Sequence, residues 1–257
     1  MDLVANLDRK IRILPRVVFL LWNKYDILIT RGDSVFKDLY ERIKNDKSII
    51  EIYNKIEEYE DNDTEKGFAY HNYDHVLNVS SIVEDILRLL NYDENFIYKA
   101  KIAAILHDTG VLQGKDDHAY RSYEFSLNYF NENSISFDEI DLVLEAIKIH
   151  SDGFDTDNII ALVLILADKL DIKKTRVAKA GRNTIGMRQF LYIEDINFKL
   201  KEKTLEVNFL VHEDIDLDEL SNYYFIKKVF KAIEAFCKKV NLNYIIFVND
   251  KEWILEK

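Results

Sequence analysis

AAILHDTG, residues 103–110, joins an apolar run to an adjacent histidine and aspartate, His107 and Asp108, and then to a turn glycine. The unbroken run of Ala, Ile and Leu predicts a buried helix. A histidine and an aspartate at its end must be paired or bind a ligand, because isolated buried polar groups are costly. Imidazole nitrogen and carboxylate oxygen together suit a first-row divalent metal. Whether these two residues form a metal site depends on where the other histidines lie.

The composition is that of a folded, mainly helical protein. Its 257 residues, 48% hydrophobic and 32% charged, are enough for one large or two small domains and exclude a disordered chain. One proline and seven glycines, beside many Lys, Glu, Ile and Leu, favour helices. The net charge of -11 argues against extended binding to a nucleic-acid backbone. An acidic protein that handles phosphates needs metal ions or a local basic cluster.

The cysteine content and the apolar runs indicate the cellular setting. Cys237 is the only cysteine, so the chain has no intramolecular disulfide and no thiolate metal cluster. The N-terminus lacks the layout of a signal peptide, and residues 17–22 are too short an apolar run to span a bilayer. The longest apolar run, residues 159–167, fits a buried helix. We therefore expect a cytoplasmic protein that does not associate with membranes.

Helical periodicity extends over the first two-thirds of the chain. Residues 11–22, 35–43 and 49–61 predict helices, with a break and cap at residues 31–34. Five more predicted helices follow: residues 70–90, 96–110, 120–130, 138–150 and 158–172. Four of them carry a His or Asp near an end or on one face, and His118 lies just before the third. A polar loop, residues 111–120, separates the second and third of these five.

The pattern changes beyond about residue 187. Residues 188–212 alternate apolar and polar side chains on both sides of a Lys-Glu-Lys turn, which predicts a β-hairpin. Residues 217–240 predict a helix, and residues 243–255 predict a second strand pair with an Asn-Asp turn. We therefore predict a mainly α protein, with a helical domain at residues 1–186 and a small α+β subdomain at residues 187–257.

Five of the six histidines lie in the predicted helical part. His71 and His75 are one turn apart, and so are expected on one helix face. His118 falls in the predicted loop, where it is either a solvated residue or a ligand. His150 ends a helix, where it either binds metal or interacts with the helix dipole. His212, in the C-terminal part, is expected to have no role in a site.

Asp168 lies within the apolar helix predicted at residues 158–172, where an unpaired carboxylate would cost several kcal/mol. It is either a metal ligand, an exposed helix residue or the partner of a nearby lysine: Lys169, Lys173 or Lys174.

The ordered set His75, His107-Asp108, His118, His150 and Asp168 resembles the HD superfamily of metal-dependent phosphohydrolases, over about residues 68–175. The stretch YHNYDH, residues 70–75, is similar to the signature of cyclic nucleotide phosphodiesterases within that superfamily. There the first histidine is a proton donor and the second a metal ligand. AIKIHSDG, residues 146–153, and LILADKLD, residues 164–171, resemble segments of bacterial HD-type hydrolases that split dinucleoside polyphosphates.

The resemblance implies an all-helical HD-domain core and a set of site residues. The basic metal site would be formed by His75, His107, Asp108 and Asp168. A second metal would use His118 and His150, with Asp108 as the bridge. The cofactor is then one or two divalent ions, with Mn, Fe, Mg, Ni, Co and Zn not distinguished. Candidate phosphate contacts, by proximity alone, are Lys115, Arg121 and Lys169.

The function predicted on this basis is hydrolysis of a nucleotide, or of another small phosphoester or phosphoanhydride, by metal-activated water. Asp108 and His71 are the predicted catalytic residues, and His71 would protonate the leaving oxygen with a pKa near the working pH. One alternative is a catalytically silent regulatory module that binds metal and nucleotide. A second is a metal-dependent oxygenase on the same scaffold. The C-terminal part is a candidate for homodimer formation in each case.

Overall fold

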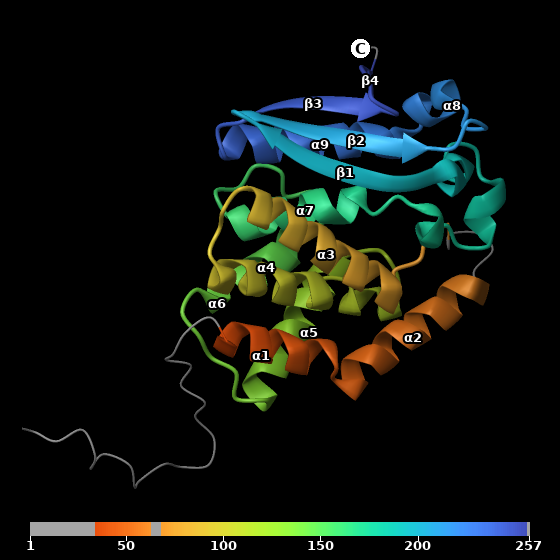
Figure 1. Cartoon of the computed structure of the whole chain (residues 1–257). Coiled ribbons are helices and arrows are strands. Elements are labelled where there is room, and N and C mark those ends of the chain that lie inside the picture. The colour runs from red at the N-terminus through yellow and green to blue at the C-terminus, as the bar shows by residue number, and fades with distance from the viewer. Residues whose placement is uncertain (1–33, 63–67, 256–257) are drawn as a thin grey trace, which may run out of the picture.

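The computed structural model of the chain describes residues 34–62 and 68–255. The helix predicted at residues 11–22 lies outside the described residues. The helical part contains α1 (Ser34–Lys44), α2 (Lys47–Asn62), α3 (Tyr73–Leu89), α4 (Glu94–Leu106), the 3-10 helix η1 (Thr109–Gln113), α5 (His118–Glu132), α6 (Ile140–Ile149) and α7 (Ile159–Leu170) (Figure 1). Short 3-10 helices follow: η2 (Lys174–Arg176), η3 (Ala180–Asn183) and η4 (Met187–Tyr192).

The C-terminal part is a four-stranded sheet with two helices. Its elements are β1 (Ile193–Lys201), β2 (Thr204–Val211), α8 (Leu217–Asn222), α9 (Tyr224–Lys239), β3 (Asn243–Val248) and β4 (Lys251–Glu252). The strand order is β1-β2-β3-β4: two antiparallel hairpins are joined by a parallel β2–β3 pair, with α9 in the crossover. The prediction of a mainly α protein with a small α+β part is confirmed. The helix predicted at residues 217–240 is interrupted at Tyr223, which has extended backbone angles.

The turn between β3 and β4 forms as its residue types predict. Asn249 and Asp250 both have positive φ, 47° and 64°. A two-residue hairpin loop with this backbone matches the right-handed twist of the strands, and asparagine and aspartate tolerate it better than most residues.

Two helices of the helical part, α4 and α7, are buried on nearly all sides. In α4 residues 97–106 are all buried, and in α7 residues 160–170 are all buried. A helix that is apolar around its whole circumference has no solvent face, so the buried helix predicted from the apolar run at residues 159–167 is confirmed. Polar side chains that follow these two helices therefore enter the middle of the protein.

The C-terminal part shares its hydrophobic core with the helices. Leu164 of α7, Ile233 of α9 and Val207 of β2 belong to one cluster of buried residues, and α9 packs against α7 (Figure 1). Cys237 is buried in this cluster. The division into two domains at residue 186 stays a prediction. In the described part of the chain, no helix is long and apolar enough to cross a membrane.

Gly110 allows the turn after α4 to pack directly against α5. A Cβ built on Gly110 would lie 2.4 Å from the carbonyl oxygen of His118 and 2.6 Å from the amide nitrogen of Ser122. The Gly110 amide donates a hydrogen bond to Ser122 Oγ, 2.9 Å away. Only glycine permits this approach, which brings the start of α5 close to the end of α4.

We expect Gly110→Ala to destabilise the protein by about 1–3 kcal/mol or more, because backbone atoms rather than flexible side chains must move. Urea denaturation followed by circular dichroism measures the change. Asn131→Ala, at an exposed position in α5, is the control and should remain within about 0.5 kcal/mol of the wild type. Equal midpoints for the two variants would contradict the packing argument.

Candidate metal centre

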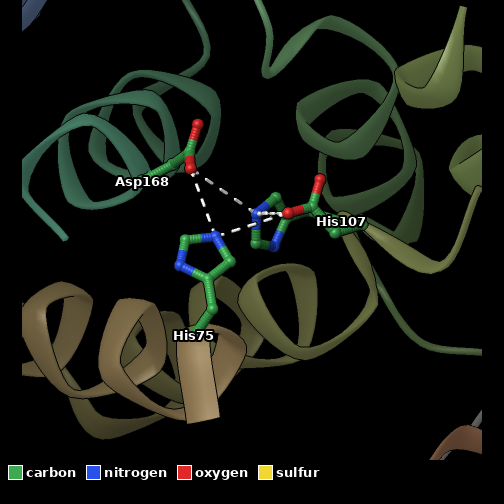
Figure 2. A group of neighbouring side chains, drawn as sticks. His75, His107 and Asp168 are labelled. Atoms are coloured by element: carbon green, nitrogen blue, oxygen red, sulfur yellow. Dashed lines mark ion pairs between the residues drawn. The ribbon is translucent and has the colours of Figure 1, made fainter. Parts of the chain in front are cut away.

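The ends of three helices bring four metal-capable side chains together. His75 lies in the first turn of α3, where the Asn72 side chain caps the helix by accepting a 3.1 Å hydrogen bond from the His75 amide. His107 and Asp108 directly follow α4, and Asp168 lies in the last turns of α7. Figure 2 shows His75, His107 and Asp168 pointing toward one another. With Asp108 they place four ligand atoms within 4.8 Å of one another.

The distances among these four residues suit a shared cation. His75 Nε2 lies 3.3 Å from Asp108 Oδ2 and 3.3 Å from Asp168 Oδ1. His107 Nε2 lies 3.1 Å and 3.9 Å from the same two oxygens. All four side chains are nearly fully buried, so water does not compensate their charges and lone pairs.

The hydrogen bonds at Nδ1 leave the Nε2 lone pairs of His75 and His107 facing the centre. His107 Nδ1 lies 2.8 Å from the carbonyl oxygen of Ala104, which can only accept, so Nδ1 carries the proton in the neutral ring. His75 Nδ1 is 2.7 Å from Asp171 Oδ2 in the same way. His75 Nε2, His107 Nε2 and Asp108 Oδ2 are buried without a hydrogen-bond partner among the described residues. Three unpaired acceptors around one point are what a metal ion would satisfy.

A second group shares Asp108. Its other oxygen, Oδ1, lies 3.5 Å from His118 Nε2 and 3.3 Å from His150 Nε2. The two imidazoles meet Nε2 to Nε2 at 3.0 Å, while their Nδ1 atoms face the carbonyl oxygens of Lys115 and Ile147 at 2.7 Å and 2.8 Å. Two Nε2 lone pairs in contact repel unless a proton or a cation lies between them. Asp108 therefore offers one oxygen to each of two groups.

The charges of the site respond strongly to burial and to one another. Although burial opposes ionisation, His107 holds the pKa of Asp108 well below its usual range, and Lys169 does the same for Asp168. Burial and the charge of Arg176 oppose protonation of His75, but the adjacent carboxylates of Asp108, Asp168 and Asp171 raise its pKa to about 10. The carboxylates thus attract positive charge, which a proton on His75 supplies and a metal ion would replace.

His71 does not lie on the helix face of His75, so that prediction is wrong. Asn72 is the N-cap of α3, so His71 precedes the helix. The two rings are nevertheless close, with centroids 6.0 Å apart. Glu60, buried near the end of α2, accepts a 2.7 Å hydrogen bond from the His71 amide and contacts its Nδ1 at 2.5 Å. The tertiary structure, rather than a shared helix, brings His71 to the site.

The expected pKa of His71 near the working pH is also wrong. Burial, together with the positive charge of Arg176, lowers the pKa of His71 to about 3 despite the Glu60 carboxylate. His71 is therefore neutral at pH 7 in the protein alone. Its Nδ1 faces Glu60, which leaves Nε2 as the atom available to a ligand.

His118 begins α5 rather than lying in a loop, and its side chain is 19% exposed. The loop predicted at residues 111–120 was too long because η1 and the start of α5 occupy most of it. His150 follows α6 and is buried. His212 is half-exposed beside Asp214 in the C-terminal part, away from both groups.

The three predicted phosphate contacts have other contacts in the structure. Lys169 is buried, and its Nζ atom lies 2.6 Å from Asp168 Oδ2. Asp168 therefore has the lysine partner that was one of its predicted alternatives and is also one of the four metal-capable residues. Arg121 donates hydrogen bonds to the carbonyl oxygens of Gly110 and Gly114. Lys115 Nζ lies 3.8 Å from Glu60 Oε1. That these side chains contact a substrate stays a prediction.

Sequence reasoning missed three buried charged residues beside the site: Glu60, Asp171 and Arg176. The sequence could have indicated Asp171, since it lies one helical turn beyond Asp168 in LADKLD and is expected on the same face. Glu60 is one of many acidic residues in its segment, and nothing in the sequence distinguishes it. Arg176 lies in a basic connecting segment, where a buried arginine looks the same as a solvated one.

Comparison with known proteins identifies part of the chain. Residues 72–173 match the family model of the HD domain. The match begins at the cap of α3 and ends just after α7, so it contains both metal-capable groups. A search of curated proteins found no match.

We expect Asp171→Asn to weaken binding of divalent metal by about tenfold or more, because the carboxylate that orients His75 and increases its basicity is lost. Isothermal titration of metal-free protein with Mn²⁺ or Zn²⁺ measures the affinity. Asp141→Asn, an exposed change in α6, should bind as the wild type does. Equal affinity of both variants would show that Asp171 does not support the centre.

The depressed pKa of His71 predicts a specific acid sensitivity. Between pH 6.5 and about 3 the unfolded chain carries a proton on this histidine and the folded chain does not, so stability falls as the pH is lowered. Below pH 6.5 the wild type should therefore lose stability more steeply than His71→Gln, by about 1.4 kcal/mol per pH unit. Urea titrations at pH 6.5, 6.0 and 5.5 test this. His212→Gln should follow the wild type, and parallel curves for wild type and His71→Gln would contradict the assignment.

Proposed function

Because residues 72–173 are an HD domain, we propose that the protein is a metal-dependent phosphohydrolase acting on a nucleotide or another small phosphoester or phosphoanhydride. The observation that carries the proposal is the set of unpaired buried acceptors: His75 Nε2, His107 Nε2 and Asp108 Oδ2. Stable burial of these atoms around one point is accounted for by a bound cation. HD domains bind divalent metals and generally belong to hydrolases.

The number of ions proposed is two. His75, His107, Asp108 and Asp168 would hold the first. His118 and His150 would hold the second, with Asp108 as the shared ligand. The 3.0 Å contact between the Nε2 atoms of His118 and His150 supports the second site, since both rings direct a lone pair to one place. The identity of the metal does not follow from this donor set, because imidazole and carboxylate suit several first-row ions.

A divalent ion bound here would lower the pKa of a water ligand and neutralise negative charge on phosphoryl oxygens. The chain supplies the remaining functions. Asp108 is ionised and buried, so it acts as an acceptor and not as a proton source. His71 holds its ring against Glu60 and presents Nε2 to the site. A bound phosphoester would bring negative charge beside this ring and raise its pKa, so that His71 holds the proton that the leaving oxygen takes.

The basic segment that pairs with the residues before His71 supports the proposal of an anionic substrate. Residues 173–182 carry five of the basic side chains of this acidic protein: Lys173, Lys174, Arg176, Lys179 and Arg182. The segment lies along residues 68–70, where Ala69 pairs with Val177 in an antiparallel bridge. A local concentration of positive charge attracts phosphates to a site on a protein whose net charge is negative.

The test is hydrolysis of a panel of nucleotides, p-nitrophenyl phosphate and bis(p-nitrophenyl) phosphate, with the purified protein supplemented with Mn²⁺, Mg²⁺, Zn²⁺, Co²⁺, Ni²⁺ or Fe²⁺. We expect at least one substrate to be hydrolysed, and Asp108→Ala to reduce that rate to the uncatalysed background. His212→Ala, whose ring lies away from both groups, should retain the wild-type rate.

Three other outcomes would contradict the proposal. Equal rates for the wild type and Asp108→Ala would show that the measured hydrolysis does not come from this site. Tight nucleotide binding by the metal-loaded protein without product would support a regulatory module. Bound iron in elemental analysis, with consumption of oxygen and no phosphate release, would support an oxygenase.

A further inference from the structure

Arg176, at the end of η2, is buried without adequate hydrogen bonding. Its side chain is only 7% exposed, and its Nη1 atom has no hydrogen-bond partner among the described residues. Its Nη2 atom lies 3.7 Å from Asp168 Oδ1, too far for a hydrogen bond. A buried guanidinium with unused donors is costly, and such groups are normally paired.

The need to balance the charge of Asp168 does not explain why Arg176 is buried beside it. Lys169 Nζ already pairs with Asp168 Oδ2 at 2.6 Å, which gives that carboxylate a close counter-charge. The oxygen nearest Arg176 is Oδ1, which also lies 3.3 Å from His75 Nε2 and is one of the metal-capable atoms. Arg176 therefore lies beside the metal-capable group without a hydrogen bond to Asp168.

The backbone holds Arg176 beside the proposed proton donor. The Tyr70 amide donates a 2.9 Å hydrogen bond to the carbonyl oxygen of Arg176, and the Ala178 amide donates a 3.1 Å bond to Phe68. Gly181 secures the same contact, since a Cβ there would lie 2.2 Å from the Phe68 carbonyl oxygen. Because His71 follows Tyr70 directly, the pairing fixes Arg176 next to it. The positive charge of Arg176 accordingly contributes, after burial, to the low pKa of His71.

We propose that Arg176 binds a non-bridging oxygen of the phosphoryl group that the site hydrolyses, an inference that rests on the proposed phosphohydrolase function. Such an oxygen would give the unused Nη1 donor the partner that it lacks. Arginine is suited to this because its planar guanidinium stays charged and donates to phosphate oxygens in a fixed geometry. Lys169 and Arg121 are less suited, since Asp168 and two loop carbonyls already engage their donors.

The direct test is binding of inorganic phosphate to the Mn²⁺-loaded protein, measured by isothermal titration, with metal content from elemental analysis. We expect Arg176→Gln to weaken phosphate binding by about 10-fold to 100-fold, the loss typical of a hydrogen bond to a charged group, at unchanged metal content. Arg188→Gln is the matched control, because Arg188 pairs with Glu219 away from the centre, and it should bind phosphate as the wild type does.

Wild-type phosphate affinity in Arg176→Gln, with full metal content, would overturn the inference. If that variant loses metal or does not fold, Arg176→Lys decides. It keeps the charge but not the planar donors, and a phosphate affinity at least about fivefold weaker at full metal content supports the proposal, whereas wild-type affinity overturns it.

Hydrolysis separates this inference from the proposed function. A protein that turns over no phosphoester, yet binds phosphate through Arg176, would contradict the function and leave the Arg176 contact intact. If the wild type turns over a phosphoester and Arg176→Gln has an unchanged KM and an unchanged phosphate affinity, the proposed function stands and the Arg176 contact is contradicted.

Discussion

The structure depends on the burial of one carboxylate, that of Asp108. It is 1% exposed, and both its oxygens face imidazole nitrogens: Oδ2 faces His75 and His107, and Oδ1 faces His118 and His150. A buried carboxylate is tolerated only when positive charge and hydrogen-bond donors compensate it. The surrounding nitrogens are acceptors in their neutral forms, so the compensation must come from protons or from bound cations. Side chains from α3, α5 and α7 and from the residues that follow α4 and α6 therefore converge on one buried point within the hydrophobic core.

Three of the four histidines around Asp108 are oriented by the same backbone contact. His107 and His150 each follow a helix, and each directs Nδ1 to the carbonyl oxygen three residues earlier, at Ala104 and Ile147. His118 makes the same contact with Lys115. At a helix C-terminus this bond uses a carbonyl that has no partner within the helix. It also fixes the tautomer, so one local contact both ends the helix and turns Nε2 toward the centre.

The segment after α7 connects this centre with the rest of the molecule. It returns to residues 68–70 and pairs with them, which places Arg176 near Asp168 and opposite Tyr70, the residue before His71. Beyond it, α9 packs against α7, so the C-terminal part supports the helix that carries Asp168 (Figure 1). Removal of the C-terminal part would expose the buried face of α7. The sheet and its helix thus contribute to the site through packing, without supplying any of the metal-capable residues.

The sequence by itself determined the helical class, the β-rich C-terminal part and the residues around Asp108, because apolar periodicity and buried polar side chains are local properties. It also indicated, through resemblance, how His118, His150 and Asp168 join them; their role as ligands stays a prediction. It did not place His71, whose expected helix face and pKa were wrong, since Asn72 starts α3 one residue later and distant charges act on the ring. Glu60, Asp171 and Arg176 became visible only in three dimensions. The sequence does not show whether a single acidic or basic residue is buried. The packing of the helices decides its burial and which side chains it contacts.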